Sequence, residues 1–395
     1  MTPFNNSLVI EHFSSGNLGI PLGESSGDQG NIPGNLGLTL DEYDPDDPLR
    51  QAFERAERTI SPIVLDLDGN GIATRSVADG TFFDYDGNGF AERTGWATSG
   101  DGLLVRDLNG DGIINNGTEL FGDRTLLKSG ETAANGFYAL ADLDDNRDGR
   151  LDSHDAAWSE LRIWQDRNSD GITDAGELTT LDELGIAGIA TGFSNTATTD
   201  SQGNQHLQQG WYTKTDGSSG RAEDIWFAVD LASTRNENPL ELSDTLRALP
   251  ELNGRGNVAS LRQVMAQQAA GGSNRLHSLV EQFGTVTDPV ARAALVTQII
   301  YVWAGVEDED PASRGGYIDD ARKLYAIERF VGEAYTGGTG NNASTILLNA
   351  FNAFASDISA QLLWQTLAPM HIHALRETLF LPCTIGPSCA ACPVE

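Results

Sequence analysis

The chain has 395 residues, of which 57 are acidic and 25 are basic, and its formal net charge is −32. This charge disfavours nucleic acids and anionic membrane surfaces as primary partners, because both repel an acidic chain, and it favours multivalent cations. No apolar run approaches the roughly 18 residues of a transmembrane segment. The opening MTPFNNSLVIEHFSS lacks the charged head and long apolar stretch of a Sec signal peptide. The three cysteines all follow residue 380, so we expect no disulfide framework in the core.

The first 232 residues divide into two regions by composition. Residues 1–60 are rich in Gly, Ser, Asn and Pro and predict a flexible segment with a short helix over Pro48–Thr59. Residues 61–232 are rich in Gly and Asp and predict an α+β module. Its expected strands cover Ile63–Leu65, Thr81–Phe83 and Leu103–Val105, and its expected helices cover Gly136–Leu143 and Ala156–Gln165.

The composition changes after a boundary near Thr234–Pro239, and Ala, Leu and Gln become frequent. Residues 240–370 predict an all-helical domain, and residues 371–395 predict a tail that carries the cysteines. Apolar residues at helical spacing, which predict a buried stripe on each helix, are Leu324, Ile327, Val331, Leu347, Phe351, Phe354, Ile358 and Leu362. Five tryptophans are expected to anchor the core of the α+β module: Trp96, Trp158, Trp164, Trp211 and Trp226.

Regularly spaced aspartates between residues 66 and 182 point to calcium. A calcium loop of the EF type takes side-chain oxygens at positions 1, 3, 5 and 12 and a backbone carbonyl at position 7, often with a water at position 9 and Gly at position 6. Five segments approach this template, and we name each loop after its first residue. A single match of this kind is only moderate evidence for a calcium site. Five matches within one stretch of chain predict that this region binds several calcium ions.

Two of the loops match the template at every position. The Asp166 loop offers Asp166, Asn168, Asp170, the Ile172 carbonyl, Asp174 and Glu177. The Asp144 loop offers Asp144, Asn146, Asp148, the Arg150 carbonyl, Asp152 and Asp155. These two loops begin 22 residues apart, which leaves room for the single helix expected over Ala156–Gln165 and predicts a compact scaffold unlike a paired EF-hand sensor.

The other three loops depart from the template near their ends. The Asp107 loop offers Asp107, Asn109 and Asp111, but its Glu119 falls one residue late and requires a one-residue bulge. The Asp66 loop offers Asp66, Asp68 and Asn70, and the Asp84 loop offers Asp84, Asp86 and Asn88. Neither of these two has an acid at position 12, although Glu92 occupies position 9 of the Asp84 loop. For both, an Asx-type turn between strands remains an alternative to a calcium site.

Several runs in this region resemble the calcium-dependent self-processing module of FrpC-like RTX proteins. They are SPIVLDLDGNG at 61–71, GLLVRDLNGDGIINNGTELFGD at 102–123, LRIWQDRNSDG at 161–171, LDELGI at 181–186 and GWYTKTDG at 210–217. The resemblance covers about residues 61–232. In the helical half, RGGYIDDARKL at 314–324 is similar to the region that follows this module in large haemolysin-type calcium-binding proteins.

The resemblance implies type I secretion, folding on calcium binding outside the cell, and roles in virulence or adhesion, with a host or cell-surface protein as partner. In FrpC-like proteins the module cuts an Asp-Pro bond directly before the calcium core through a cyclic anhydride. Here the matching bond is Ser61–Pro62, and a serine hydroxyl cannot form that anhydride. We therefore expect calcium binding without catalysis, with calcium-dependent self-processing as the alternative.

Two further alternatives remain open from the sequence. The run IVLDLDG at 63–69 resembles the first motif of HAD-type phosphatases, which would make Asp66 a nucleophile and Asp68 an acid/base on a doubly wound sheet. Near the C-terminus, a zinc site would draw its four ligands from His371, His373, Cys383, Cys389 and Cys392.

Overall fold

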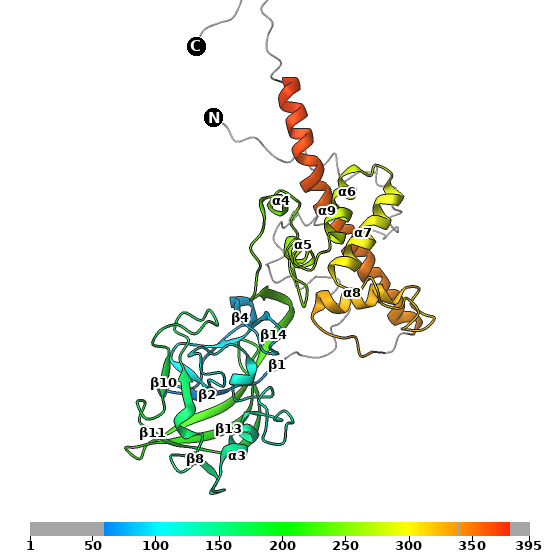
Figure 1. Ribbon diagram of the computed structural model, residues 1–395. Helices are drawn as coiled ribbons and strands as arrows, with labels where there is room; N and C mark the ends of the chain where they lie inside the picture. The colour runs from blue at the N-terminus through cyan, green and yellow to red at the C-terminus, as the bar shows by residue number, and fades with distance from the viewer. Residues whose placement is uncertain (1–58, 338–339, 380–395) are drawn as a thin grey trace, which may run out of the picture.

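The computed structural model describes residues 59–337 and 340–379 (Figure 1). A β-rich region comes first and a helical region follows, as the composition predicts. Of the helix expected over Pro48–Thr59, only Thr59 lies within the described residues, and it belongs to strand β1. The cysteines of the tail lie outside them. In the part of the chain that the structure describes, no helix combines the length and apolarity that crossing a membrane requires.

A sheet of twelve strands organises the β-rich region, and its main path runs β10-β9-β7-β2-β14-β13-β11-β8. Its strands pair antiparallel, and the 18-residue β14 is the longest. The strands of this sheet are β1 Thr59–Ile60, β2 Ile63–Asp66, β4 Thr81–Phe83, β5 Phe90–Thr94, β7 Asp101–Arg106, β8 Arg150–Asp152, β9 Leu161–Trp164, β10 Leu178–Thr180, β11 Ile186–Ala190, β12 Ser194–Thr199, β13 Gln205–Lys214 and β14 Ser219–Asn236. Strands β3 (Thr74–Arg75) and β6 (Trp96–Ala97) form a separate pair.

A buried cluster lies on each face of the sheet, and β2 contributes to both because successive side chains of a strand point to opposite faces. In β2, Ile63 and Leu65 enter the cluster that helix α3 (Gly136–Leu143) covers. Val64 enters a second cluster on the other face, with Trp96 and Trp164 at its centre. The expected strands are found at β2, β4 and β7, and the helix expected over Gly136–Leu143 is confirmed as α3.

Two expectations for this region are wrong. Residues 156–165 do not form a helix: after a 3₁₀ turn at Trp158–Glu160, they continue as β9, which pairs with β7 and β10. Strand pairing on both sides outweighs the helical pattern of this segment. Trp211 does not anchor the core either, because its side chain on β13 is 52% exposed, whereas Trp96 and Trp164 are fully buried.

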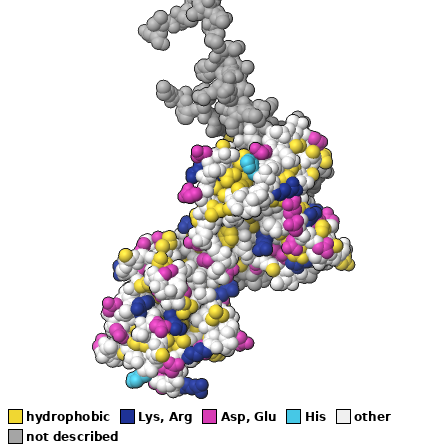
Figure 2. Space-filling model, in the orientation of Figure 1, with side chains coloured by type: hydrophobic (Ala, Val, Ile, Leu, Met, Phe, Trp, Pro, Cys, Tyr) yellow, Lys and Arg dark blue, Asp and Glu magenta, His cyan; other side chains and the backbone are white. Residues whose placement is uncertain are grey.

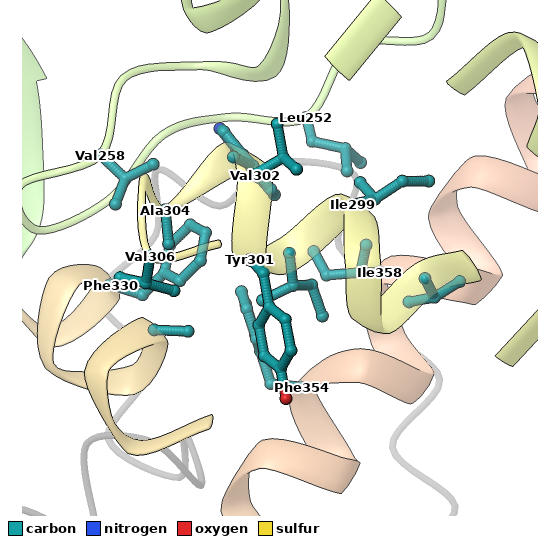
Figure 3. Packing of buried hydrophobic residues seen from close by; sticks show 14 of the residues in the cluster. Leu252, Val258, Ile299, Tyr301, Val302, Ala304, Val306, Phe330, Phe354 and Ile358 are labelled. Atoms are coloured by element: carbon teal, nitrogen blue, oxygen red, sulfur yellow. The ribbon is translucent and has the colours of Figure 1, made fainter. Parts of the chain in front are cut away.

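The helical region has a core of its own. Its helices are α4 Asp244–Arg247, α5 Leu261–Ala270, α6 Arg275–Thr285, α7 Pro289–Trp303, α8 Ala321–Val331 and α9 Asn341–Leu379. The predicted stripes are confirmed, since the eight apolar residues named from α8 and α9 are all buried. Figure 3 shows Tyr301 of α7 pointing toward Phe354 of α9, with Phe330 of α8 in the same cluster.

The end of β14 joins the two regions. The Gly256 amide donates to the Ala232 carbonyl (2.9 Å), and the Thr234 hydroxyl donates to the Gly256 carbonyl (2.7 Å). Asn88 of the Asp84 loop donates its side-chain amide to the Oδ1 of Asn257 (3.1 Å). Figure 2 shows the two lobes with acidic side chains over both, interspersed with Lys and Arg. On that face the net charge forms no single patch, so the local geometry of the loops carries the functional argument.

Candidate metal centres

The five aspartate loops all begin at or just beyond the end of a regular element. Asp66 is the last residue of β2, Asp84 and Asp107 directly follow β4 and β7, and Asp144 directly follows α3. Asp166 comes two residues after β9 ends. The sheet and α3 therefore position the first residue of each loop.

The first aspartate of every loop is held in the same way by the backbone of its own loop. The amide of the fourth residue donates to one carboxylate oxygen and the amide of the sixth residue donates to the other. The two N···O distances are 2.8 and 3.0 Å in the Asp66 loop, 2.8 and 2.9 Å in the Asp84 loop, 2.7 and 2.8 Å in the Asp107 loop and 2.6 and 2.8 Å in the Asp166 loop. In the Asp144 loop the fifth and sixth amides, of Asp148 and Gly149, take these places.

The backbone that makes these bonds is left-handed at positions 4 and 6. Glycine occupies position 6 in all five loops, with φ between 71° and 96° at all of the glycines concerned. Arg147 and Ser169 adopt the same conformation at position 4, with φ of 59° and 58°. Non-glycine residues with positive φ are uncommon, so the repeated conformation shows that the loops share one backbone form.

Three loops close on an acid that binds two further amides. Glu177 accepts from the amides of loop positions 2 and 9, Arg167 (2.8 Å) and Asp174 (3.1 Å). Asp155 accepts from the corresponding amides of Asp145 and Asp152. Glu119 accepts from Leu108 (3.0 Å) and Asn115 (2.7 Å), although it is one residue late. A 3₁₀ turn at Gly117–Glu119 accommodates the extra residue.

The Asp84 loop closes on Glu92 of β5, which occupies loop position 9 and whose role the sequence alone does not indicate. Its Oε2 accepts from the amide of loop position 2, Tyr85 (3.0 Å). One carboxylate oxygen from each of Asp84, Asp86 and Glu92 lies within 4.8 Å of the others. The pKa of Glu92 is raised to about 8, chiefly by burial and in part by the nearby Asp86 and Asp84, while the hydrogen bond from the Tyr85 amide opposes the shift.

The Asp66 loop is joined by an acid from another strand, Asp101 of β7. One oxygen from each of Asp66, Asp68 and Asp101 lies within 4.8 Å of the others. Burial raises the pKa of Asp101 to about 6. Asp101 is not recognisable from the sequence, because no local motif marks a residue so far along the chain from the Asp66 loop; only the pairing of β2 with β7 reveals it.

The donors suit a hard divalent cation, since carboxylate and carbonyl oxygens are the ligands that calcium takes in proteins. Groups of three acids within 4.8 Å are confined, over residues 59–337 and 340–379, to the Asp66 and Asp84 loops. In the Asp166 loop, Asn168 donates to both Asp170 (3.0 Å) and Asp174 (3.1 Å) and so connects the acids. Burial raises the pKa of Asp166 in that loop, and the loop amides oppose the shift.

Comparison with known proteins now identifies this region. Residues 63–228 match the family model of the SPM domain. The chain is also 41% identical over 245 residues to the iron-regulated protein FrpA of Neisseria meningitidis serogroup C. That alignment covers 62% of this chain but only 22% of FrpA, so the chain matches about a fifth of that relative's length. The resemblance noted from the sequence is thereby confirmed, and all five loops fall inside the residues that match the SPM domain.

The Ser61–Pro62 bond lies directly before the SPM domain and is buried. Ser61 is 2% exposed, its amide donates to Oδ1 of Asp123 (3.2 Å), and its hydroxyl accepts from the Asp123 amide (3.1 Å). Asp224 of β14 is fully buried nearby and accepts from the Gly136 amide (2.5 Å). Burial raises the pKa of Asp224 to about 7, while the Gly136 amide and the Ser61 hydroxyl oppose the shift.

The sheet contradicts the phosphatase alternative. HAD-type chemistry needs Asp66 at the carboxyl end of a strand in a doubly wound, parallel sheet. Strand β2 instead pairs antiparallel with both neighbours, β14 and β7. Asp66 and Asp68 also belong to a loop form that recurs four more times, which a single nucleophile does not explain. The phosphatase interpretation is therefore wrong.

Proposed function

We propose that residues 61–232 form a calcium-binding module of a secreted haemolysin-type, RTX-related bacterial protein. In this proposal the module is one domain, residues 240–370 form a second, all-helical domain, and residues 1–60 and 371–395 flank them. The module binds several calcium ions through EF-hand-like loops. Its ligands are the residues named for each loop in the sequence, with Glu92 added to the Asp84 loop.

The shared hydrogen-bond frame of the five loops is the observation that supports this proposal best. In each loop the backbone amides hold the first carboxylate, and in three of them a closing acid is held by two more amides. An Asx turn needs the first of these features but not the second. Because the closing acid is the position that supplies a bidentate calcium ligand in EF-type loops, the arrangement favours metal loops over simple turns.

The electrostatics of the loops give calcium an organising role. Acids crowded within a few ångström repel one another when ionised, and burial raises the pKa of Asp84, Glu92 and Asp166 further. A divalent cation removes this repulsion and stabilises the folded state by RT ln(1 + [Ca]/Kd), about 1.4 kcal/mol per site at a tenfold excess over Kd. Sites of the extracellular class, with Kd on the order of 10⁻⁴–10⁻³ M, stay empty in the cytosol and fill outside the cell.

This calcium dependence fits export of a loosely folded chain by a type I apparatus, followed by folding outside the cell. The SPM domain and the similarity to FrpA support an RTX-related protein of this kind. In the proposal, the folded protein then contributes to virulence or adhesion through a host or cell-surface protein.

The experiment that tests calcium-driven folding is circular dichroism of the full chain. Spectra are recorded in chelator and then in millimolar calcium, with millimolar magnesium as the control for ionic strength and divalent charge. We expect calcium alone to produce the near-UV signal of packed aromatic side chains. Identical, fully folded spectra in chelator and in calcium would contradict the proposal.

A second candidate function is calcium-dependent self-processing, which the position of the Ser61–Pro62 bond directly before the residues that match the SPM domain favours. Among the Asp-Pro bonds that the sequence contains, Asp47–Pro48 lies nearest to this position, and it falls outside the described residues. A denaturing gel of the full chain after incubation in millimolar calcium separates the two candidates. An intact band supports the binding module, whereas discrete fragments that require calcium support the self-processing enzyme.

A further inference from the structure

Asp101 carries a buried carboxylate oxygen that its surroundings do not satisfy. Its side chain is only 2% exposed, and its Oδ2 accepts from the Ala73 amide (2.9 Å). Its Oδ1 has no hydrogen-bond partner among the described residues, and the amide of Leu67 has only a weak influence on the carboxyl. An unsatisfied buried carboxylate oxygen costs free energy, so this atom needs a ligand.

The strand register makes the position of Asp101 more costly still. Asp66 and Asp101 are direct partners across the antiparallel β2–β7 pair. Like charges directly opposite each other on neighbouring strands destabilise a sheet. The third acid, Asp68, comes close because residue 100 is glycine: a Cβ there would lie 2.7 Å from Oδ2 of Asp68. A cation among the three carboxylates would remove both the repulsion and the unsatisfied oxygen.

Asp101 also takes the place that the closing acid holds in the other loops. The Asp66 loop has Val77 at position 12, which offers no side-chain oxygen. Asp101 accepts from Ala73, at loop position 8, much as Glu177 accepts from position 9 of its own loop. The missing acid of the Asp66 loop is thus supplied from a different strand.

We propose that Asp101 is a calcium ligand that completes the Asp66 loop, with Asp66 and Asp68 supplying the other carboxylates. This inference rests on the proposed function, because it assumes that calcium is the ion which these loops bind. It goes beyond that function in one respect. An ion bound by residues of both β2 and β7 would link the Asp66 loop to two central strands of the sheet. The bound ion then stabilises the pairing of these strands as well as the loop itself.

The test is isothermal titration of the full chain with calcium chloride, using Asp101→Asn as the variant. Asparagine has nearly the same shape and can still accept from the Ala73 amide, but it lacks the charge. We expect the variant to bind one ion fewer than the parent, or to bind it at least tenfold more weakly. Asp224→Asn is the matched control, since it neutralises a buried acid outside the loops and is expected to leave the titration unchanged.

A second measurement separates a calcium ligand from a purely structural residue. In chelator, where the proposed function leaves the module loosely folded, Asp101→Asn relieves repulsion and is expected to retain at least as much residual structure as the parent by circular dichroism. In millimolar calcium it is expected to unfold at a lower temperature than the parent. A structural role alone would reduce the residual structure in chelator as well and would overturn the proposal.

Asp68→Asn tests the same site without disturbing the core, because the Asp68 side chain is exposed. If Asp68 and Asp101 bind one ion, the double variant loses no more calcium than either single variant. Additive losses would overturn the proposal, as would a parent-like titration of Asp101→Asn. A parent that binds no calcium at all would instead contradict the proposed function.

Discussion

Trp96 donates its indole N–H to Oδ2 of Asp166 (2.9 Å), which joins the core of the sheet to the first residue of a candidate calcium loop 70 residues away. Trp164 makes the corresponding contact at the other end of the loop, where its N–H donates to Oε2 of Glu177 (3.2 Å). The two indole rings pack edge to face, with their centroids 5.5 Å apart. Order in this loop and packing of the aromatic core are therefore linked.

Tryptophan fluorescence should report this link. On removal of calcium we expect the emission to shift to the red, because Trp96 and Trp164 lose their dry environment when the Asp166 loop becomes disordered. The exposed Trp211 and Trp364 contribute a background that does not respond, and a variant with Trp211→Phe and Trp364→Phe removes it. Emission that is the same in chelator and in calcium would show that the loop does not control the core.

Two loop glycines differ in how much space they leave for a methyl group. Both have positive φ, but a Cβ at Gly149 meets nothing within 4 Å, whereas one at Gly171 would lie 2.1 Å from the Phe82 carbonyl oxygen. We expect Gly149→Ala to cost about 1–2 kcal/mol of left-handed backbone strain. Gly171→Ala should cost roughly a further 1–3 kcal/mol from overpacking. Urea denaturation in saturating calcium measures both; equal losses would contradict the close approach of the Asp166 loop to β4.

The pH dependence of stability should contain a contribution from Asp224. Its pKa rises from 3.8 to about 7 in the folded protein, so between these values the folded state binds more protons than the unfolded state. Stability therefore falls as the pH rises through this window, by up to about 1.4 kcal/mol per pH unit.

An Asp224→Asn variant removes this titration. Its free energy of unfolding, measured in saturating calcium, should fall less steeply than that of the parent between pH 5 and pH 8. The variant should gain on the parent at the upper end of that range, where the buried carboxylate of the parent is ionised. Parallel pH profiles for the two proteins would contradict the assignment of a raised pKa to Asp224.

Restoring an aspartate before Pro62 tests the self-processing alternative. In Ser61→Asp, the new carboxylate can attack its own backbone carbonyl, form a cyclic anhydride and break the bond to the Pro62 nitrogen, which takes up a proton. We expect the parent to remain intact in millimolar calcium and the variant to be cut at this bond. Ser61→Asn has nearly the same shape but no carboxylate, so it serves as the control. A Ser61→Asp variant that binds calcium but stays intact would contradict this prediction. It would show that the residues around the Ser61–Pro62 bond no longer support self-cleavage.

Features that depend on short stretches of chain were predictable from the sequence. The left-handed turns at Gly69–Gly71 and Gly110–Gly112 follow from the alternation of Asp, Asn and Gly, because the first aspartate binds amides only three to five residues away. The stripe from Leu347 to Leu362 was likewise readable, since α9 places residues at this spacing on one face.

Features that depend on strand pairing were not predictable. Asp101 joins the Asp66 loop only because β7 lies beside β2, and no spacing along the chain encodes that register. Residues 161–164 were expected to be helical because their pattern is ambiguous over a short run, and their pairing with β7 and β10 decides the outcome. Trp211 is exposed because its position on β13 points away from the two buried clusters.

The central claim is that the aspartate loops bind calcium, and equilibrium dialysis with metal analysis tests it most directly. The full chain, dialysed against millimolar calcium, is predicted to bind several ions per molecule. Asp170→Ala and Asp148→Ala, which alter the two loops that match the template fully, are each predicted to bind fewer ions than the parent. A parent that binds no calcium, or variants that bind as much as the parent, would contradict the account.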